Sequence, residues 1–126
     1  SYLPWNWEPL EEAGLLIAVE GAQELMPGIS VRPMPGHNRG NQGVIVAGGG
    51  RRLFYVGDLI PTRHHIQPTW CMGYDLDVNT CVDERLHLLE EICGTEDLLA
   101  FDHDPECWAG RVTKDERGRY QVECVD

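Results

Sequence analysis

Two histidines and an aspartate of this chain each stand just beyond a short apolar run: His37, Asp58 and His103. Apolar runs of this length, bounded by Gly or Pro, are typical of β-strands, so each polar side chain is expected where a strand leaves its sheet. A glycine precedes both His37 and Asp58, which lets the backbone turn sharply at that exit. If the three strands share one edge of a sheet, the three side chains converge.

These three residue types together suit a metal centre. Zn²⁺ binds imidazole and carboxylate ligands, and in catalytic sites it takes three protein ligands and a water molecule, which it converts to hydroxide near neutral pH. Taken singly, a histidine beside a turn is more often a capping or surface residue, and Gly-Asp after a strand is a common turn. Because the pattern occurs three times, the sequence favours a metal site. A mononuclear His-Asp-His iron site is the weaker alternative, since the close H-x-D pairing of such sites is absent.

Five apolar runs predict the strands that would carry these residues. They are Leu15 to Val19, Ile29 to Met34, Val44 to Ala47, Leu53 to Val56 and Leu98 to Phe101. The glycines at positions 48–50 predict a hairpin between the third and fourth runs rather than a phosphate loop, because no helix follows them. The segment 110–125 predicts a second hairpin that turns at Glu116-Arg117-Gly118.

One clear helix is expected between Asp58 and His103. Its apolar residues recur at helical spacing: Val82, Leu86, Leu89 and Cys93. Asp77 or Asn79 can cap its start, and Gly94 can end it. The segment 59–77 has the prolines and aromatics of a loop, and the stretch 2–12 shows no helical period. The sequence therefore predicts a single α/β domain that consists mostly of strands.

Composition excludes two classes of partner and suggests a compartment. The 126 residues carry a net charge of -11, and the few Lys and Arg are scattered, so no basic surface is available for nucleic acid or an anionic membrane. No apolar stretch is long enough to cross a bilayer, and the first residues do not resemble a signal peptide, so a cytoplasmic protein is expected. The five cysteines are irregularly spaced without C-x-x-C, which favours reduced thiols over disulfides or a zinc ribbon.

Three motifs together resemble a known family. They are "PGHNRGNQ" at 35–42, "FYVGDLIPT" at 54–62 and "FDHDPE" at 101–106. In this order, with a helix between the last two, they resemble the C-terminal half of metallo-β-lactamase-fold hydrolases. The resemblance spans nearly the whole chain, so residues 1–126 are expected to be that half-domain. The stretch from Asp58 to Asp77 is most similar to the group with lactonase-like and organophosphate-hydrolase-like members.

The resemblance implies a fold and a mechanism. The fold would be half of a four-layer αββα sandwich, with the metal ions at one edge of its two sheets. His37 would be a ligand of a first metal, Asp58 would bridge two metals, and His103 would complete the second site. The cofactor of the complete enzyme would be two divalent ions, expected to be zinc. Metal-bound hydroxide would attack an ester, a lactone or a similar bond of a small-molecule substrate, with the metals stabilising the developing oxyanion.

One motif of the family is missing. Its members carry H-x-H-x-D-H in the N-terminal half, whereas here His64 and His65 are adjacent and His87 stands alone. The chain is therefore expected to be a fragment with an incomplete metal site, inactive by itself, that pairs with the missing half or with a second copy of itself. The alternative is a non-catalytic folded remnant or domain-swapped assembly module, because half a sandwich must cover its apolar face.

Residues near the three candidate ligands allow two interpretations each. His65 is either a catalytic group that contacts substrate or shuttles protons, or a solvated loop residue, and we expect His64 at the surface. Asp102 and Asp104 flank His103 and are candidates to orient it, and for Asp104 the alternative is a simple turn at Asp104-Pro105.

Overall fold

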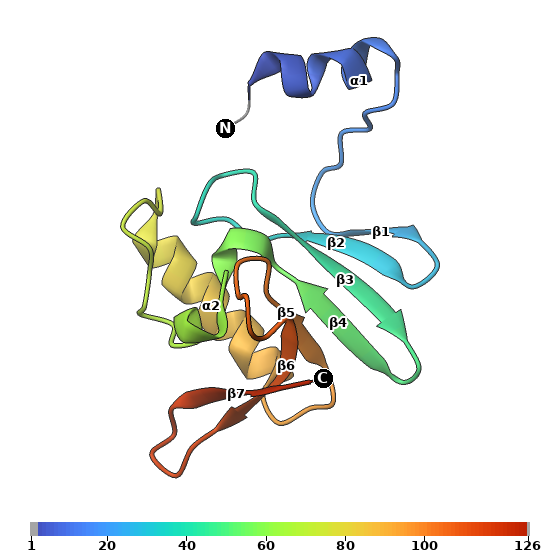
Figure 1. Ribbon diagram of the computed structural model, residues 1–126. Helices are drawn as coiled ribbons and strands as arrows, with labels where there is room; N and C mark the ends of the chain where they lie inside the picture. The colour runs from blue at the N-terminus through green and yellow to red at the C-terminus, as the bar shows by residue number, and fades with distance from the viewer. Residues whose placement is uncertain (1–2, 126) are drawn as a thin grey trace.

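The computed structural model describes residues 3–125 as one seven-stranded sheet with a helix, α2, against one face (Figure 1). The strands are β1 Gln23–Met26, β2 Ile29–Pro33, β3 Gln42–Gly48, β4 Arg51–Tyr55, β5 Leu98–Ala100, β6 Ala109–Lys114 and β7 Tyr120–Cys124. The α-helices are α1 Glu8–Glu12 and α2 Val78–Ile92, and the short 3-10 helices are η1 Pro4–Asn6, η2 Gly57–Leu59 and η3 Arg63–His65. The predicted α/β class, mostly strands with one clear helix, is confirmed.

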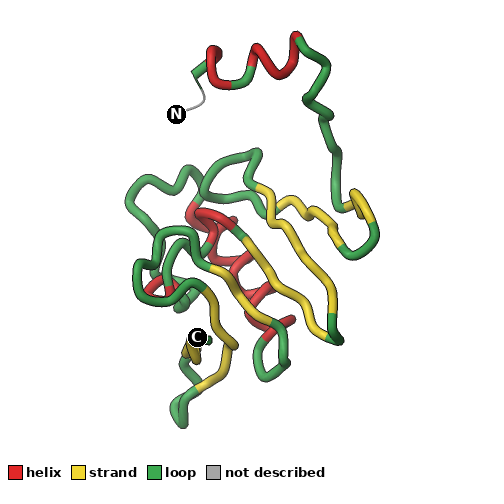
Figure 2. Tube along the Cα trace, turned by 45° about the vertical axis from the view of Figure 1, so that its right-hand side comes forward, coloured by secondary structure: helices red, strands yellow, loops and turns green. Residues whose placement is uncertain are grey.

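The topology of the sheet places the carboxyl ends of β4 and β5 side by side. The strands follow one another in chain order, and all neighbours are antiparallel except β4 and β5. These two run parallel, with Leu53 beside Leu98, and parallel neighbours need a crossover connection. The crossover contains α2, which lies behind the strands in Figure 2. The carboxyl ends of β4 and β5 therefore point the same way, with Asp58 and His103 directly beyond them.

The helix α2 has the predicted bounds but not the predicted buried face. The carboxylate of Asp77 caps its start by accepting a hydrogen bond from the N–H of Thr80, over 3.1 Å, and the helix stops before Gly94, whose φ is +75°. The buried residues are Cys81, Arg85, Leu88, Leu89 and Ile92. The predicted stripe is only half-buried except for Leu89. Arg85 is fully buried on the face of α2 that packs against the sheet. A search for apolar periodicity misses it because its side chain is charged.

The core lies between α2 and the sheet. Phe54 of β4, Leu99 of β5 and Val112 of β6 are fully buried there. Leu59 and Ile60, from the turn after β4, are part of the same cluster and are also fully buried. Each side chain of this size contributes about 1.5–3 kcal/mol on burial. The apolar residues that follow β4 thus anchor the turn that carries Asp58.

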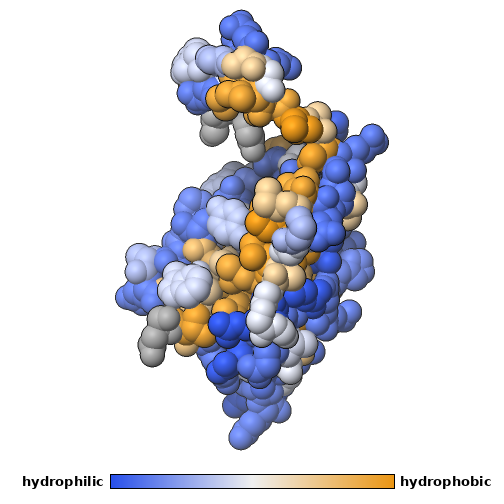
Figure 3. Space-filling model, turned by 90° about the vertical axis from the view of Figure 1, so that its right-hand side faces the viewer, coloured by the Kyte–Doolittle hydropathy of each residue, from blue (hydrophilic) through white to orange (hydrophobic). Residues whose placement is uncertain are grey.

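The opposite face of the sheet is open in the described part of the chain. Val44 pairs with Tyr55 and Val46 pairs with Leu53, so all four side chains project to this face. Val46 is 41% exposed and Tyr55 is 43% exposed, and Trp108 beside them is 53% exposed. Figure 3 shows an apolar band that runs from the N-terminal segment over the body of the molecule. Because β3 and β4 are apolar on both faces, the sequence predicts two covered faces, and the chain itself covers one.

The N-terminal segment differs from the sequence-based prediction. Leu15 to Val19 is not a strand, because it has no neighbour to pair with: β1 begins only at Gln23 and pairs with β2. The stretch before it contains η1 and α1 despite its lack of helical period, with Pro4 and Pro9 in the first turns, where a proline is tolerated. Tyr2 lies outside the described residues. The segment stands away from the sheet in Figure 1 and exposes most of its large apolar side chains: Leu3, Trp5, Trp7, Leu10, Leu15, Leu16 and Ile17.

The prediction of five reduced cysteines is wrong. Cys107 and Cys124 form a disulfide that ties the loop after β5 to the end of β7. Cys71, Cys81 and Cys93 are free. The two bonded residues meet only through the β6–β7 hairpin, so their spacing in sequence does not reveal the pair. Disulfides are rare in the cytosol, so the cytoplasmic location stays a prediction that this bond does not support.

Both predicted hairpins are confirmed. β3 and β4 join through Gly49 and Gly50, which have φ values of +62° and +80° that glycine adopts without strain. β6 and β7 join around Gly118, where the carboxylate of Asp115 accepts hydrogen bonds from the N–H groups of Arg117 and Arg119.

An ion-pair network at the start of β4 links the sheet to the turn before β5. The guanidinium of Arg52 donates to Asp97 from Nε and Nη2, over 3.0 and 2.7 Å, and the backbone N–H of Arg52 donates to the same carboxylate over 2.7 Å. Burial acts against ionisation of Asp97, which is 7% exposed, but the bonds from Arg52 outweigh it and lower the pKa of this carboxyl. The carboxylate is therefore a structural link.

We expect Asp97→Ala to lower the free energy of unfolding by about 2 kcal/mol, because it removes the acceptor of three hydrogen bonds and leaves partly buried donors unpaired. Urea unfolding followed by circular dichroism measures the change. The matched control is Glu96→Ala, since the exposed carboxylate of Glu96 is 3.8 Å from Arg111, and it should cost less than about 0.5 kcal/mol. Equal losses in the two variants would contradict the structural role of Asp97.

Candidate metal centre

His37, Asp58 and His103 come together at one edge of the sheet. The Nε2 atom of His37 is 3.5 Å from Oδ2 of Asp58, and the Nε2 atom of His103 is 3.3 Å from Oδ1 of the same carboxylate. Asp58 thus lies between two imidazoles and offers one oxygen to each. Both contacts agree with the convergence expected from the strand exits, and the metal-binding role of the three residues stays a prediction.

The position of His37 depends on close packing against α2. Gly36 has a φ of +128°, and a Cβ atom at this position would lie 2.6 Å from the backbone nitrogen of Cys81. Only glycine fits there. The side chain of His37 is 15% exposed, and its Nδ1 atom is 2.9 Å from Oδ1 of Asp75. The ring of Tyr74 stands edge-on to it, with the centroids 5.8 Å apart. The imidazole is therefore held on several sides.

Asp58 is part of η2, the turn that follows β4. Gly57 has a φ of +54°, so the chain can turn directly before the carboxylate. The side-chain amide of Asn41 donates to the carbonyl of Met34 over 2.9 Å and to the carbonyl of Val56 over 3.3 Å. This amide holds the loop of His37 beside the exit of β4. Sequence reasoning did not identify that role, because both partners are backbone carbonyls.

His103 is in the loop after β5, and its side chain is 63% exposed. Its backbone N–H donates to the carbonyl of Pro61 over 3.0 Å, which ties it to the loop after Asp58. The buried carboxylate of Asp104 accepts hydrogen bonds from the N–H groups of Arg63 and Cys107. Burial acts against ionisation of Asp104, but these bonds lower its pKa. Of the two interpretations of Asp104, the structural one is supported, because it bonds to its own loop and to η3.

A further carboxylate, Asp102, joins the site. Asp58, Asp102 and His103 each offer one ligand atom within 4.8 Å of the others. Asp102 also accepts a hydrogen bond from the hydroxyl of Tyr55 over 3.5 Å. Desolvation, together with the charge of Asp102, raises the pKa of Tyr55, so the phenol stays protonated and donates. The sequence indicates Asp102 only as a neighbour of His103, and the short β5 is what brings it to the same edge.

The donor atoms of the site fit a divalent metal ion. Imidazole nitrogens and carboxylate oxygens are ligands that Zn²⁺ and similar ions prefer. The side chain of Asp58 is 37% exposed and that of His103 is 63% exposed, so the site is open on one side to solvent and to further ligands. His37, Asp58, His103 and Asp102 could hold metal here. Cys81 does not add a thiolate ligand near neutral pH, because burial raises the pKa of Cys81 to about 11.

The other histidines lie outside this cluster of four. His65 is half-buried in η3, with Nδ1 2.8 Å from the hydroxyl of Thr62. Burial, and to a smaller extent the charge of Arg85, lowers the pKa of His65, so its ring is neutral at pH 7. A catalytic role of His65 stays a prediction. His64 and His87 are exposed, as the sequence predicts.

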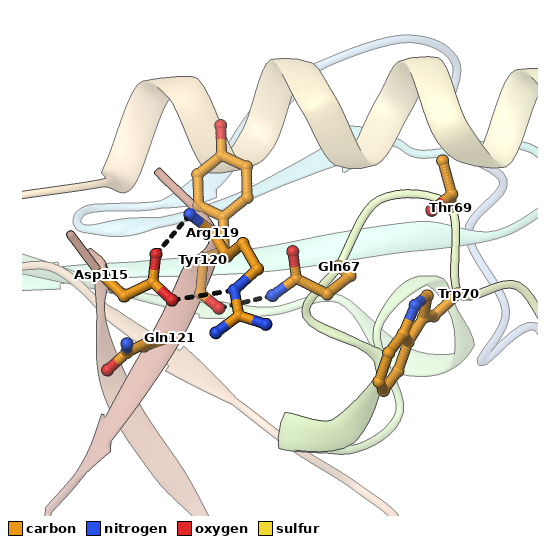
Figure 4. A pocket seen from close by; sticks show the side chains of 7 residues that line it. All are labelled: Gln67, Thr69, Trp70, Asp115, Arg119, Tyr120 and Gln121. Atoms are coloured by element: carbon orange, nitrogen blue, oxygen red, sulfur yellow. Dashed lines mark hydrogen bonds and ion pairs between the residues drawn. The ribbon is translucent and has the colours of Figure 1, made fainter. Parts of the chain in front are cut away.

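A pocket of about 280 Å³ lies between the loop after η3 and the β6–β7 hairpin (Figure 4). Gln67 donates to the carbonyl of Tyr120, and Arg119 donates to Asp115, so polar groups of the pocket pair with one another. Trp70 flanks it and is 60% exposed. None of the four candidate ligands lines this pocket, so it is separate from the candidate metal centre.

The lowered pKa of His65 predicts an acid-sensitive contribution to stability. The folded state disfavours the imidazolium form, so this contribution is fully present above about pH 6.5 and is lost as the pH falls below that value. We expect the free energy of unfolding of His65→Gln to fall less than that of the wild type between about pH 7 and pH 5. The exposed neighbour supplies the control: His64→Gln should keep the wild-type slope. Denaturant titrations across this range measure it, and identical slopes in all three proteins would contradict the expectation.

Solved structures resemble the chain, although neither a protein-family model nor a curated protein matches its sequence. The hydrolase AbOPH of the beta-lactamase superfamily matches with a TM-score of 0.84 and 18% identity, over 98% of this chain and 43% of that one. AidC, a dizinc quorum-quenching lactonase, matches with a TM-score of 0.78 and 21% identity, over 98% and 42%. A probable metal-dependent hydrolase from Staphylococcus aureus matches with a TM-score of 0.72 and 22% identity, over 90% and 42%.

This likeness concerns the fold of part of those enzymes. The chain spans about two fifths of their length. In residues 3–125, no helix has the length and apolar character needed to cross a membrane. The single sheet with α2 on one face corresponds to one half of a layered sandwich. The chain therefore has half of the metallo-β-lactamase fold, as its three motifs predict.

Proposed function

We propose that the chain is the C-terminal half of a metal-dependent hydrolase that attacks an ester, a lactone or a similar bond of a small molecule. The observation that carries this proposal is the carboxylate of Asp58, which faces His37 at 3.5 Å and His103 at 3.3 Å. One carboxylate shared by two imidazoles suits a ligand that bridges two divalent ions. The similar solved structures, which include a metal-dependent hydrolase and a dizinc lactonase, support this function.

Each residue of the centre has a proposed task. Zinc ions, when bound, would supply hydroxide near neutral pH and polarise the carbonyl of the substrate. His37 and His103 offer Nε2 nitrogens, and Asp58 offers one oxygen toward each of them. Asp102, which accepts a long hydrogen bond from the hydroxyl of Tyr55, places a second carboxylate beside His103. His65 is the group proposed to shuttle protons: its ring is neutral near pH 7 and has an acceptor nitrogen, although the burial that lowers its pKa makes it a weaker base.

A lactone is the first substrate to test. AidC is described as a complex with a homoserine product, and an N-acyl homoserine lactone hydrolase of TM-score 0.59 and 21% identity has its product bound at the catalytic metal centre. Those ligands belong to those proteins, and a related small molecule is our proposal for this chain. AbOPH is described only as a hydrolase of the beta-lactamase superfamily, so simple esters belong in the same assay.

The chain alone offers too few ligands for two zinc ions. No H-x-H-x-D-H motif is present in its sequence, and the four candidate ligands are shared around one carboxylate. We therefore propose that the isolated chain binds metal weakly and that hydrolysis requires a second chain carrying the H-x-H-x-D-H motif. The partner would be the missing half or, in the absence of that half, a second copy.

The open sheet face supports a partner. Apolar surface removed from water contributes about 25 cal/mol per Å², so the face formed by Val46, Leu53, Tyr55 and Trp108 favours association. The same face favours the second candidate function, a non-catalytic assembly module. The two candidates differ in one respect, because only the hydrolase half needs Asp58 and its imidazoles to bind metal.

We expect weak but specific zinc binding. In isothermal titration calorimetry, Asp58→Asn should bind Zn²⁺ at least about tenfold more weakly than the wild type, because the shared carboxylate is lost. Glu90→Gln, an exposed change of the same kind on α2, should bind like the wild type. Dialysis against a mild chelator should remove the metal from the isolated chain. Equal affinities of the wild type and Asp58→Asn would support the assembly module instead.

Light scattering should show at least a dimer of the isolated chain. Val46→Lys places a charge on the open face and should shift the assembly toward monomer, because an ammonium group cannot be buried there without a partner. Gln121→Lys, an exposed change on β7, should leave the assembly unchanged. A wild-type chain that stays monomeric at high concentration would contradict the argument from the open face.

A further inference from the structure

We propose that Asp75 is a positioning residue for the metal centre: it accepts a hydrogen bond from Nδ1–H of His37 and thereby fixes the tautomer that leaves Nε2 free to bind metal. The metal-binding part of this inference rests on the proposed function, whereas the tautomer does not. Neither the strand-exit pattern nor the three motifs identify Asp75, which is part of the irregular segment before α2.

The geometry of His37 carries the first step. Nδ1 is 2.9 Å from Oδ1 of Asp75, and Nε2 is 3.5 Å from Oδ2 of Asp58. A neutral imidazole has one N–H and one lone pair, and the hydrogen bond made by one nitrogen decides the state of the other. The shorter contact, to a fully buried carboxylate, takes the N–H. Nε2 then presents its lone pair toward Asp58, and two acceptors that face each other are suited to a cation between them.

The carboxylate of Asp75 is itself fixed in place. Its Oδ2 atom accepts a hydrogen bond from the backbone N–H of Met72 over 2.9 Å. The Nη2 atom of Arg85 lies 3.9 Å from the same oxygen, and the side chains of Asp75 and Arg85 are both fully buried. Within residues 3–125 this Nη2 atom is a buried side-chain nitrogen without a hydrogen-bond partner, so it acts on Asp75 through its charge. A buried carboxylate is costly unless it is hydrogen-bonded and lies beside an opposite charge, and Met72 and Arg85 meet both needs here.

The backbone joins the two segments that carry the pair. The N–H of Leu76 donates to the carbonyl of His37 over 3.2 Å, and the N–H of Asp77 donates to the carbonyl of Gly36 over 2.9 Å. These bonds place Asp75 directly beside His37 before any metal binds. Carboxylate–histidine–metal arrangements of this type orient the ring and raise its basicity, and loss of the carboxylate commonly weakens metal binding 10- to 100-fold (an order-of-magnitude range).

The sharpest variant is Asp75→Asn, which has nearly the same shape. Its amide oxygen would stay with the N–H of Met72 and the charge of Arg85, so its NH₂ group would face Nδ1 of His37. The ring would then carry its proton on Nε2, which blocks the metal-binding nitrogen. The matched control is Asp77→Asn, two residues away, because it makes the same change in charge and asparagine is also a good helix cap.

Long-range ¹H–¹⁵N spectra of histidine-labelled protein, recorded without metal at about pH 9, where unperturbed imidazoles are neutral, report the tautomer directly. We expect the Nδ1–H form of His37 in the wild type and in Asp77→Asn, and the Nε2–H form in Asp75→Asn. The amide spectrum of each variant verifies its fold. An Nε2–H tautomer of His37 in the wild type would overturn the proposal, and this outcome does not depend on whether Asp75→Asn folds.

Zinc titration of the same proteins gives the second readout. Asp75→Asn should bind Zn²⁺ about tenfold or more weakly than the wild type, and Asp77→Asn should bind like the wild type. Wild-type affinity in an Asp75→Asn chain that has switched its tautomer would overturn the link to metal binding. Failure of the proposed function has a different signature, because Asp58→Asn would then bind zinc like the wild type while His37 kept its Nδ1–H tautomer.

Discussion

One buried guanidinium, that of Arg85, holds the loops of the candidate metal centre to α2. It donates to the carbonyl of Leu59 over 2.6 Å and to the carbonyl of Trp70 over 2.7 Å, with a longer bond to Pro68. A buried cation is costly unless its donors are bonded and its charge is compensated. Here three carbonyls bond Nε and Nη1, and Asp75 compensates the charge beside Nη2. The segment between β4 and α2 contains only the short helices η2 and η3. The bonds from Arg85 to its carbonyls fix this segment instead of regular secondary structure. The turn of Asp58 and the partner of His37 both depend on this guanidinium.

The strand exits and the helix could be predicted because their signals are local. Apolar runs, the glycines at 36 and 57, and the Asp77 cap each act within a few residues, so the convergence of His37, Asp58 and His103 followed from sequence. The residues that hold the candidate ligands in place could not be predicted in this way. Arg85, Asp75 and Asn41 act on backbone or side-chain groups that are distant along the chain, and single-sequence patterns contain no record of such partners. The Cys107–Cys124 disulfide was missed for the same reason.

The errors at the N-terminus have a different cause. An apolar run such as Leu15 to Val19 has the composition of a strand, but a strand forms only where a neighbour supplies hydrogen bonds, and here it has none. On β3 and β4 the apolar pattern predicts two covered faces, whereas residues 3–125 cover only one, because Val46 and Leu53 face outward. Both the run Leu15 to Val19 and the outer face of β3 and β4 therefore have apolar side chains that residues 3–125 do not cover.

The parallel pairing of β4 with β5 has a consequence for the order in which the molecule forms. The hairpins bring together residues that are close along the chain, whereas Leu53 meets Leu98 only after the whole crossover has been ordered. Closing such a loop costs conformational entropy before its contacts repay it, so non-local pairing is slow. During synthesis, His37 and Asp58 emerge well before His103. The two sides of the candidate metal centre are therefore united late in folding.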